Sequence, residues 1–369
     1  MFNLAKCNFC GICLERCHYS EFTKEQCAEE IRKLIKGEPT RITEECVTCF
    51  ACNLYCPTGA NPSDLIQRRM EEQGYVVAPT FRHIIEESDS EEFAPTRVIW
   101  GETGKPIIHA CTFYEWIPHY YEGQLFEGAT FLIGGHFACR LYWEHSARQS
   151  VFKECLPKKV ENIARVAGGR EVVMMHDDCY SAFTTKAMEW GINVPFKPVH
   201  QAEYFLGYLK AHKAQIKKLN LKVAYHLPCA SNYTPWQNEW IDEIMELIGC
   251  ERVKRTYDRD NHLCCGTVVA SRHGKEASIR TRRANIEDAK AAGAEAFILQ
   301  CPLCALNLRD MAKEAGMEPY MLAQLCSLAL GEKPAGPGAG LGDDRGWLKI
   351  PIGIITGQIT QLNELKKQP

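Results

Sequence analysis

Cysteines whose spacing could hold a metal cluster stand out in the second part of the chain. The group consists of Cys229, Cys264, Cys265, Cys301 and Cys304. Two adjacent cysteines cannot both bind one tetrahedral ion without strain, whereas a C-x2-C turn can. The five thiols together therefore predict a cluster in which more than one thiolate bridges metal atoms.

The run Cys264-Cys265-Gly266 within this group resembles the CCG signature of the cysteine-rich domain of heterodisulfide reductases. The resemblance implies that the five cysteines hold a noncubane 4Fe-4S cluster, at which a disulfide is reduced to two thiols. It therefore makes Cys229, Cys264, Cys265, Cys301 and Cys304 the expected catalytic and cluster-binding residues.

A second group of cysteines near the N-terminus repeats one spacing, C-x2-C-x2-C-x3-C. The first set is Cys7, Cys10, Cys13 and Cys17, and the second is Cys46, Cys49, Cys52 and Cys56. In bacterial ferredoxins with this spacing, three cysteines of a run hold one 4Fe-4S cubane and the fourth holds the other. The expected ligand sets are Cys7, Cys10, Cys13 and Cys56 for one cubane, and Cys46, Cys49, Cys52 and Cys17 for the other. Zinc sites or disulfides are the alternatives.

The composition is that of an ordinary globular protein. The 369 residues are 46% hydrophobic and 24% charged, enough for two or three domains. A formal net charge of −3 argues against a nucleic-acid partner. Twenty cysteines at cluster spacings, without an N-terminal signal segment, predict the cytoplasm of an anaerobe. No apolar run is long enough to span a membrane, so we expect no direct span.

The elements that must position the N-terminal cysteines are predicted to be helices. Thr23 and Gln26 form a capping box and Gly37 ends the helix that follows, while Asn61-Pro62 begins another. The pattern resembles the α-helical ferredoxin modules of heterodisulfide reductase subunits and succinate dehydrogenases.

From about residue 97, short apolar segments alternate with helical ones, and one order of features occurs twice. Residues 106–111 correspond to 222–229, 136–139 to 262–265, and 176–179 to 301–304. This repetition predicts two tandem Rossmann-like α/β halves, with clusters in the loops that follow the strands.

The expected organisation therefore has four parts. Residues 1–85 form an α-helical ferredoxin domain with two 4Fe-4S clusters, and the acidic residues 86–93 form the linker to the next domain. Residues 97–215 form a degenerate CCG-like half, and residues 216–331 an intact CCG half with the noncubane cluster. Residues 332–369, rich in Gly and Pro at their start, form a flexible connector and tail.

The first half departs from the second in its thiols. It keeps Cys111, Cys139 and Cys179 but has Ala138 and His176 where two further thiols would stand. A tetrahedral Cys3His set can hold zinc, so Cys111, Cys139, His176 and Cys179 form a candidate altered site. The alternative is a structural scaffold with buried free cysteines.

Other residues carry weaker signals. His226 and His262 precede cluster cysteines, either as donors to sulfur or as core histidines. Cys155, Cys250 and Cys326 match no motif and are expected to be core thiols. No GxGxxG fingerprint or P-loop occurs, so no flavin or nucleotide is expected in this chain.

The resemblance covers residues 1 to about 330 and looks like a D-type heterodisulfide reductase subunit, or a C-type ferredoxin joined to B-type CCG domains. It implies an oxidoreductase subunit that passes single electrons through two cubanes to a noncubane cluster able to reduce or form a disulfide. Its partners would be other subunits of a redox complex, including a flavin- or iron–sulfur-containing electron donor, and a disulfide or thiol substrate.

The alternative is a pure relay and docking subunit with no disulfide substrate of its own. Such a subunit would serve a larger flavin-containing, acyl-CoA reductase or 2-hydroxy-acid oxidising complex.

Overall fold

The structure is a computed structural model that describes residues 1–75, 95–114 and 117–334. The expected linker at residues 86–93 and nearly all of the expected tail lie outside these ranges. No helix within the described residues is long and apolar enough to cross a lipid bilayer.

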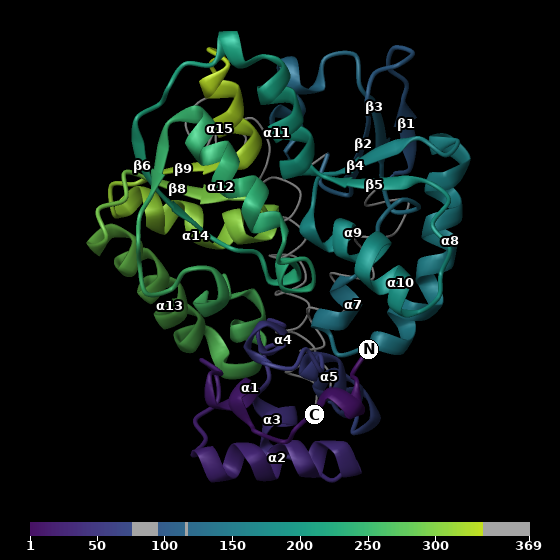
Figure 1. The fold of residues 1–369 in the computed structure, drawn as a ribbon, viewed down its shortest axis with the longest axis vertical. Helices are drawn as coiled ribbons and strands as arrows, with labels where there is room; N and C mark the ends of the chain where they lie inside the picture. The colour runs from purple at the N-terminus through teal and green to yellow at the C-terminus, as the bar shows by residue number, and fades with distance from the viewer. Residues whose placement is uncertain (76–94, 115–116, 335–369) are drawn as a thin grey trace, which may run out of the picture.

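Residues 1–75 form a helical unit, which lies at the bottom of Figure 1. Its helices are α1 (Ile12–Glu15), α2 (Lys24–Lys36), α3 (Arg41–Glu45), α4 (Cys52–Tyr55) and α5 (Pro62–Glu72). As predicted, α2 begins at a capping box of Thr23 and Gln26 and ends at Gly37, whose φ is 81°. The predicted start of α5 at Asn61-Pro62 is also confirmed.

A first sheet follows, with the strand order β1-β3-β2-β4-β5. Its strands are β1 (Arg97–Ile99), β2 (Ile107–Cys111), β3 (Thr130–Ile133), β4 (Glu171–Met174) and β5 (Lys197–His200). Only β1 runs antiparallel to its neighbour, and the other pairs are parallel. The helices of this region are α7 (Tyr142–His145), α8 (Gln149–Ala167), α9 (Asp177–Ser181), α10 (Ala187–Glu189) and α11 (Gln201–Ala211).

The second sheet is entirely parallel, with the order β7-β6-β8-β9. Its strands are β6 (Leu221–Tyr225), β7 (Cys250–Arg252), β8 (Ala296–Leu299) and β9 (Glu318–Met321). Its helices are α12 (Gln237–Ile248), α13 (Thr267–Ala291), α14 (Pro302–Glu314) and α15 (Leu322–Ala329). A break divides α13 at Gly274, whose φ of 84° and ψ of 169° are not helical.

The two sheets share one strand order. In each, the first parallel strand (β2 or β6) pairs with the second on one side and with the third on the other, and the fourth lies beyond the third. All residues of β2 and β8 are buried, as expected for parallel strands covered on both faces. The predicted α/β class with parallel sheets is confirmed, and Figure 1 shows the sheets side by side above the helical unit.

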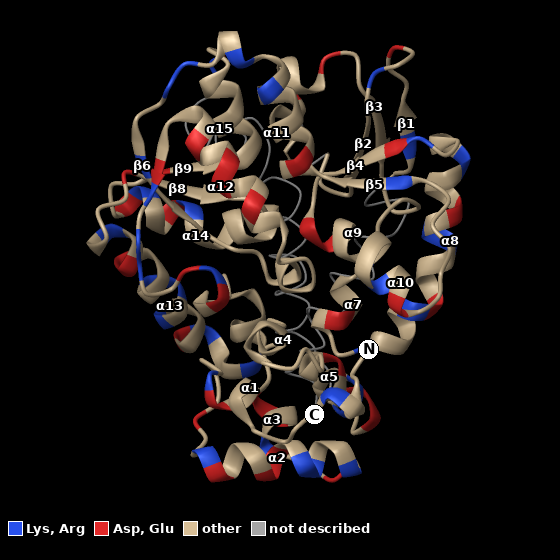
Figure 2. Ribbon diagram, viewed as in Figure 1, with Lys and Arg blue, Asp and Glu red and all other residues tan. Residues whose placement is uncertain are grey.

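The remaining cysteines divide by burial. Cys250 and Cys326 are buried as predicted, but the prediction is wrong for Cys155, which is partly exposed on α8. The apolar side of α8 faces the core through Phe152, Leu156 and Ile163, and Cys155 lies beside this stripe. Figure 2 shows both acidic and basic residues along the helices α2 and α13.

Candidate metal-cluster site

The five cysteines of the second sheet region line one cavity. Cys229 follows β6, Cys264 and Cys265 precede α13, and Cys301 and Cys304 lie at the start of α14 after β8. The structure thus brings together, at the carboxyl ends of parallel strands, all of the residues that the sequence predicts for the noncubane cluster.

Hydrogen bonds connect these thiols in a row. Cys264 contacts Cys229 and Cys265, and Cys304 contacts Cys265 and Cys301. The hydrogen bond from Cys264 does most to hold the pKa of Cys265 well below its ordinary value, and Cys304 adds to it. A hydrogen bond from Cys304 also does most to lower the pKa of Cys301 to about 7, against the effect of burial. Both thiols therefore favour the thiolate form that binds metal.

Gly266 allows the adjacent cysteines to face the cavity. Its φ is 100°, and a Cβ on this residue would lie 2.7 Å from the Ser278 hydroxyl oxygen. The same hydroxyl donates a hydrogen bond to the Gly266 carbonyl at 2.8 Å. A side chain at position 266 would therefore displace the turn that presents Cys264 and Cys265.

The first half contributes the opposite wall of the cavity through Tyr142, His145, His176 and Asp178. The Nε2 atom of His176 lies 3.1 Å from the Cys301 sulfur, and its Nδ1 lies 3.8 Å from the Asp178 carboxylate. Burial disfavours a charged His176, but Asp178 and Cys301 outweigh it and hold the pKa of His176 well above its ordinary value. His176 therefore contacts the cysteine that corresponds to it in the repeat.

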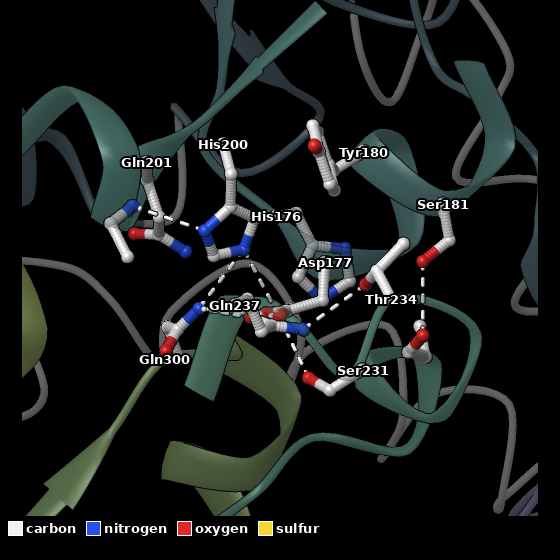
Figure 3. Close-up of polar contacts among 12 residues, drawn as sticks. His176, Asp177, Tyr180, Ser181, His200, Gln201, Ser231, Thr234, Gln237 and Gln300 are labelled. Carbon is white, nitrogen blue, oxygen red and sulfur yellow. Dashed lines mark hydrogen bonds and ion pairs between the residues drawn. The ribbon is translucent and has the colours of Figure 1, made fainter. Parts of the chain in front are cut away.

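A buried polar network behind the cavity holds the two halves in register (Figure 3). The Asp177 carboxylate accepts hydrogen bonds from Ser231 at 2.8 Å, from Gln300 at 3.2 Å and from His200 at 3.3 Å. Because His200 Nδ1 accepts the backbone N–H of Ala202, its Nε2 carries the proton that faces Asp177. One carboxylate thereby fixes three loops, those that carry His176, Cys229 and Cys301.

The remaining thiols of the first half form a group of their own. Cys179 makes hydrogen bonds with Cys111 and with Cys139, and all three cysteines are buried. Of the candidate altered site, the structure brings the three thiols together, while His176 points to Cys301 in the other half.

The two predicted ferredoxin sets also surround cavities. One cavity is lined by Cys17, Cys46, Cys49 and Cys52, and the other by Cys7, Cys10, Cys13 and Cys56. Cys13 borders both. Burial raises the pKa of Cys49 and of Cys52 well above the ordinary value, so their thiolates would require a cation for stability.

The sulfur donor sets are compatible with iron–sulfur clusters. Within the described ranges, no group of three or more His, Cys, Asp or Glu side chains is arranged to hold one metal ion. Thiols spread around a cavity suit a cluster of several metal atoms, and sulfur donors suit iron–sulfur chemistry. The assignment of each cysteine to a cluster stays a prediction.

The helical unit meets the second half at the loop of Cys46 and Cys49. Asn232 Nδ2 donates to the Cys49 carbonyl at 2.8 Å, and the Arg272 guanidinium donates to the Cys46 carbonyl at 3.1 Å. The Cys264 backbone N–H donates to the Tyr19 hydroxyl at 2.6 Å. The cavity of the Cys17 set therefore lies close to the five-cysteine cavity.

Comparison with known proteins bears on the second half. Residues 223–309 match the cysteine-rich CCG domain. All five cysteines of the cavity lie within this range. The domain is found in B-type subunits of heterodisulfide reductases. Together with the cysteine content, the match indicates an iron–sulfur redox subunit.

A solved structure gives a fold likeness over most of the chain. It is described as a hypothetical protein from Helicobacter pylori, with 12% sequence identity and a TM-score of 0.53. The alignment covers 87% of this chain and 68% of the other. No curated protein matches the sequence.

Of the residues that the first half adds to the cavity, sequence reasoning named His176, as part of the candidate altered site, and missed Tyr142, His145 and Asp178. Asp178 lies in residues 176–179, which match Cys301–Cys304 in the repeat, and this match could have indicated that it lies near the cavity. Nothing in the sequence around His145 and Tyr142 indicated that they line it. His226 and His262 do not line the cavity. His226 accepts from Asn285 at 3.0 Å, and burial lowers the pKa of His226 to about 3, which fits the alternative of core histidines.

Proposed function

We propose that the chain is an iron–sulfur electron-transfer subunit of a heterodisulfide-reductase-like complex. In this proposal the cysteines of the helical unit hold two 4Fe-4S cubanes, and the five cysteines of the CCG domain hold a noncubane 4Fe-4S cluster. The site reduces or forms a disulfide, and other subunits deliver or take up the electrons. The observation that carries the proposal is that all five CCG cysteines line one cavity next to the cavity of the Cys17 set.

The clusters would supply single electrons at low potential and an iron atom that can bind sulfur. Reduction of a disulfide RS–SR′ takes two electrons and two protons, breaks the S–S bond and yields RSH and R′SH. The electrons come from a low-potential donor in the complex, and the protons come from water.

The residues of the chain have separate parts in this chemistry. His176 contacts the Cys301 sulfur, where it can donate a hydrogen bond to a thiolate. Thr267 lies 3.5 Å from the Cys265 sulfur and accepts a hydrogen bond from Asn307, so its own proton is free to face sulfur. Asp177 follows His176 in the chain and accepts hydrogen bonds from Ser231 and Gln300, so it helps to position His176 relative to Cys301.

A relay without a disulfide substrate is the second candidate, and burial favours it. Cys264, Cys265, Cys301 and Cys304 are between 2% and 7% exposed, which restricts access to their sulfurs. Cys229 is partly exposed and offers the more open side of the cavity. A relay site would need no such opening.

Iron analysis with EPR and Mössbauer spectroscopy of the anaerobically purified protein separates the two candidates. About twelve irons per chain and a paramagnetic signal that depends on added thiol under oxidising conditions would support the disulfide site. About twelve irons without a thiol-dependent signal would support a relay. About eight irons would contradict a cluster in the CCG domain.

A further inference from the structure

Three thiols of the first half lie at the carboxyl end of its sheet, at the place that corresponds to the five cysteines of the second half. Cys111 ends β2, Cys139 follows β3, and Cys179 lies in α9 after β4. Strand β2 pairs with β3 on one side and with β4 on the other, so the segments that follow both strands begin beside the end of β2. Cys179 contacts Cys111 and Cys139 and is therefore the member that both contacts share.

These thiols do not complete either kind of metal site that the sequence suggested. Ala138 and His176 stand where the second half has two further cysteines, so the five-thiol set is incomplete. His176 lies 3.1 Å from the Cys301 sulfur of the other half. Within the part of the chain that the structure describes, no group of three His, Cys, Asp or Glu side chains could hold one metal ion. The reaction that adjacent thiols can still undergo is oxidation to a disulfide.

The backbone of Cys111 departs from an ordinary strand at this contact. The φ of Cys111 is 56°, in the left-handed region that residues other than glycine rarely adopt. The register of β2 against β3 shifts between His109 and Cys111, and a shift of this kind re-aims the side chain that follows it. Backbone strain persists only where the surroundings hold it, and it gathers at functional sites. A cysteine kept only as a small core residue would need neither the shift nor the left-handed φ.

Burial restricts what can react with these thiols. Cys111 is 6% exposed, Cys139 4% and Cys179 0%. A peptide thiol or a disulfide as large as that of glutathione must bring its own sulfur into line with the attacked one, which these exposures prevent. Hydrogen peroxide is little larger than water and enters a buried site through local fluctuations. The oxidant that suits this group is therefore a small peroxide.

We propose that Cys111 and Cys179 form a reversible disulfide when a small peroxide reaches them, and that Cys139 can take the place of Cys111 by exchange. In the first step the O–O bond of the peroxide breaks, one thiol becomes a sulfenic acid and one water leaves. The neighbouring thiol then displaces the hydroxyl group from that sulfur as a second water. In sum, two thiols and one H2O2 give one S–S bond and two waters, and the two electrons come from sulfur. Attack of Cys139 on the Cys179 sulfur moves the bond and frees Cys111, which takes the proton that Cys139 loses.

The disulfide would reach the five-cysteine cavity through α9. Cys179 lies on this helix between Asp177 and Ser181, and both of these side chains hydrogen-bond to the short helix Cys229–Tyr233, which begins with a cysteine of the cavity. The Asp177 carboxylate accepts a hydrogen bond from this segment at 2.8 Å, and the Ser181 hydroxyl donates to one of its carbonyls at 2.9 Å. A bond that draws Cys179 toward the end of β2 therefore moves two contacts that support the Cys229 loop.

Peptide mapping of the full-length, cluster-loaded protein tests the disulfide. Hydrogen peroxide is added in steps under anaerobic conditions until Cys155, which is partly exposed, is oxidised, so that the dose is sufficient. Free thiols are alkylated after an acid quench, and linked peptides are identified by mass spectrometry before and after reduction with dithiothreitol. A glutamate-specific protease separates Cys111 from Cys139, because no Lys or Arg lies between them in the sequence. We expect Cys179 to be linked mainly to Cys111 and less to Cys139, and both linkages to disappear on reduction.

Serine variants identify the partners in the disulfide. Cys179→Ser should abolish both linkages, because it removes the shared partner, and Cys111→Ser should leave Cys179 linked to Cys139 alone. Cys326→Ser is the matched control, because Cys326 is a fully buried thiol of the second half, and it should leave the yield of the linkage unchanged. Circular dichroism equal to that of the native protein shows that each variant is folded. If a variant does not fold, the mapping of the native protein decides the pairing by itself.

Hydrogen exchange tests the connection to the cavity. Oxidation should change the exchange of the peptide that contains residues 229–233 in the native protein but not in Cys179→Ser. Unchanged exchange in the native protein, at a dose that forms the linkage, would overturn this part of the inference.

The outcomes are distinct from those of the proposed function. The inference is overturned if Cys179 is linked to neither neighbour at a dose that oxidises Cys155. Sulfinic or sulfonic acids at these thiols in place of a linkage overturn it as well. An iron count that contradicts a cluster in the CCG domain leaves the disulfide standing, and absence of the disulfide leaves the proposed function standing.

Discussion

The two α/β halves have the same strand order but present different side chains at the ends of their strands. The second half directs five cysteines into one cavity, whereas the first keeps three buried thiols in mutual contact and directs His176, Asp178 and His145 across to the other half. The difference shows that a repeated fold can yield one site rather than two. One half holds the sulfur donors, and the other forms the wall that faces them.

The largest expected effect is the loss of iron when one thiol of the second half is removed. The matched removal of a thiol from the first half tests the comparison. Cys265→Ser should lower the iron content by about four atoms per chain, because it removes one of the five thiols that would hold the proposed cluster. Cys179→Ser, the matched change in the first half, should leave the iron content unchanged. Iron loss in Cys179→Ser would show that the first half also binds metal and would end the asymmetry.

The buried residue Lys186 allows a second test of the difference between the halves, through its effect on their packing. It is fully buried, and its ammonium lies 2.7 Å from Asp64 of the helical unit and 3.0 Å from Glu144. Lys186 follows Cys179 at the same distance at which Met311 follows Cys304. Lys186→Met therefore gives the first half the residue of the second and removes the buried cation between Glu144 and Asp64, of which Asp64 keeps the N-terminal ammonium at 2.9 Å. The change should cost about 3–5 kcal/mol in the free energy of unfolding.

Urea denaturation measures this loss in the free energy of unfolding. Lys158→Met is the control, because Lys158 is exposed and pairs with Glu161, and its expected change is below about 1 kcal/mol.

The stabilisation by Lys186 should depend on pH. Burial raises the pKa of Glu144, while Lys186 and the N-terminal amine hold the pKa of Asp64 below 3.8 against the effect of burial. As the pH falls, Glu144 is thus protonated before Asp64, and the benefit of Lys186 shrinks. The pKa of Lys186 is raised above 10.5, mainly by these carboxylates against burial, so the difference should be constant from about pH 7 to pH 9. A difference that grows in acid would contradict this account.

The His176→Gln variant tests the role of the cavity wall that the first half contributes. A hydrogen bond to a thiolate ligand stabilises the more negative reduced cluster, so its loss should lower the midpoint potential by about 50 mV, or about 1 kcal/mol for one electron. EPR-monitored redox titration measures the shift. His109→Gln is the control in the first half, because His109 is also buried but contacts the Phe137 carbonyl at 2.7 Å. Equal shifts in both variants would show that His176 has no special relation to the cluster.

Tyr19→Phe should have the most local effect, confined to the loop of Cys264. It removes the hydroxyl that accepts the Cys264 backbone N–H and leaves this buried donor without its partner, at a cost of about 1–3 kcal/mol. Hydrogen exchange of the peptide that contains Cys264 should become faster, while a peptide around Cys139 in the first half should not change. Unchanged exchange at Cys264 would mean that the contact contributes nothing to the order of the CCG loop.

Much of the fold was predictable because its local signals are strong. The capping box at Thr23 and the apolar runs of β2 and β8 depend on neighbours in sequence, so periodicity and caps reveal them. The grouping of the five cysteines was predictable because their spacing matches a cluster motif. Cys155 was placed wrongly because one residue of drift around a helix moves a side chain from the core to its edge.

The contribution of the first half to the cavity could not be predicted. The contact between His176 and Cys301 depends on how two halves pack, through α11 against α12 and through the Asp177 network, and no spacing within one half encodes it. The same reason hid His145, which reaches the cavity while its Nδ1 is held by the Thr48 carbonyl of the helical unit.

The contact between the helical unit and the second half bears on whether the helical unit could be replaced by another in a chimera. Asn232, Arg272 and His273 donate to main-chain oxygens of residues 43, 45, 46 and 49 of the helical unit. Every amino acid provides such an oxygen, so these contacts depend on the path of the backbone and tolerate changes of side chain. A helical unit with another sequence but the same loop would keep these contacts in a chimera, provided that the Tyr19 hydroxyl and the pairing of Arg16 with Asp260 are retained.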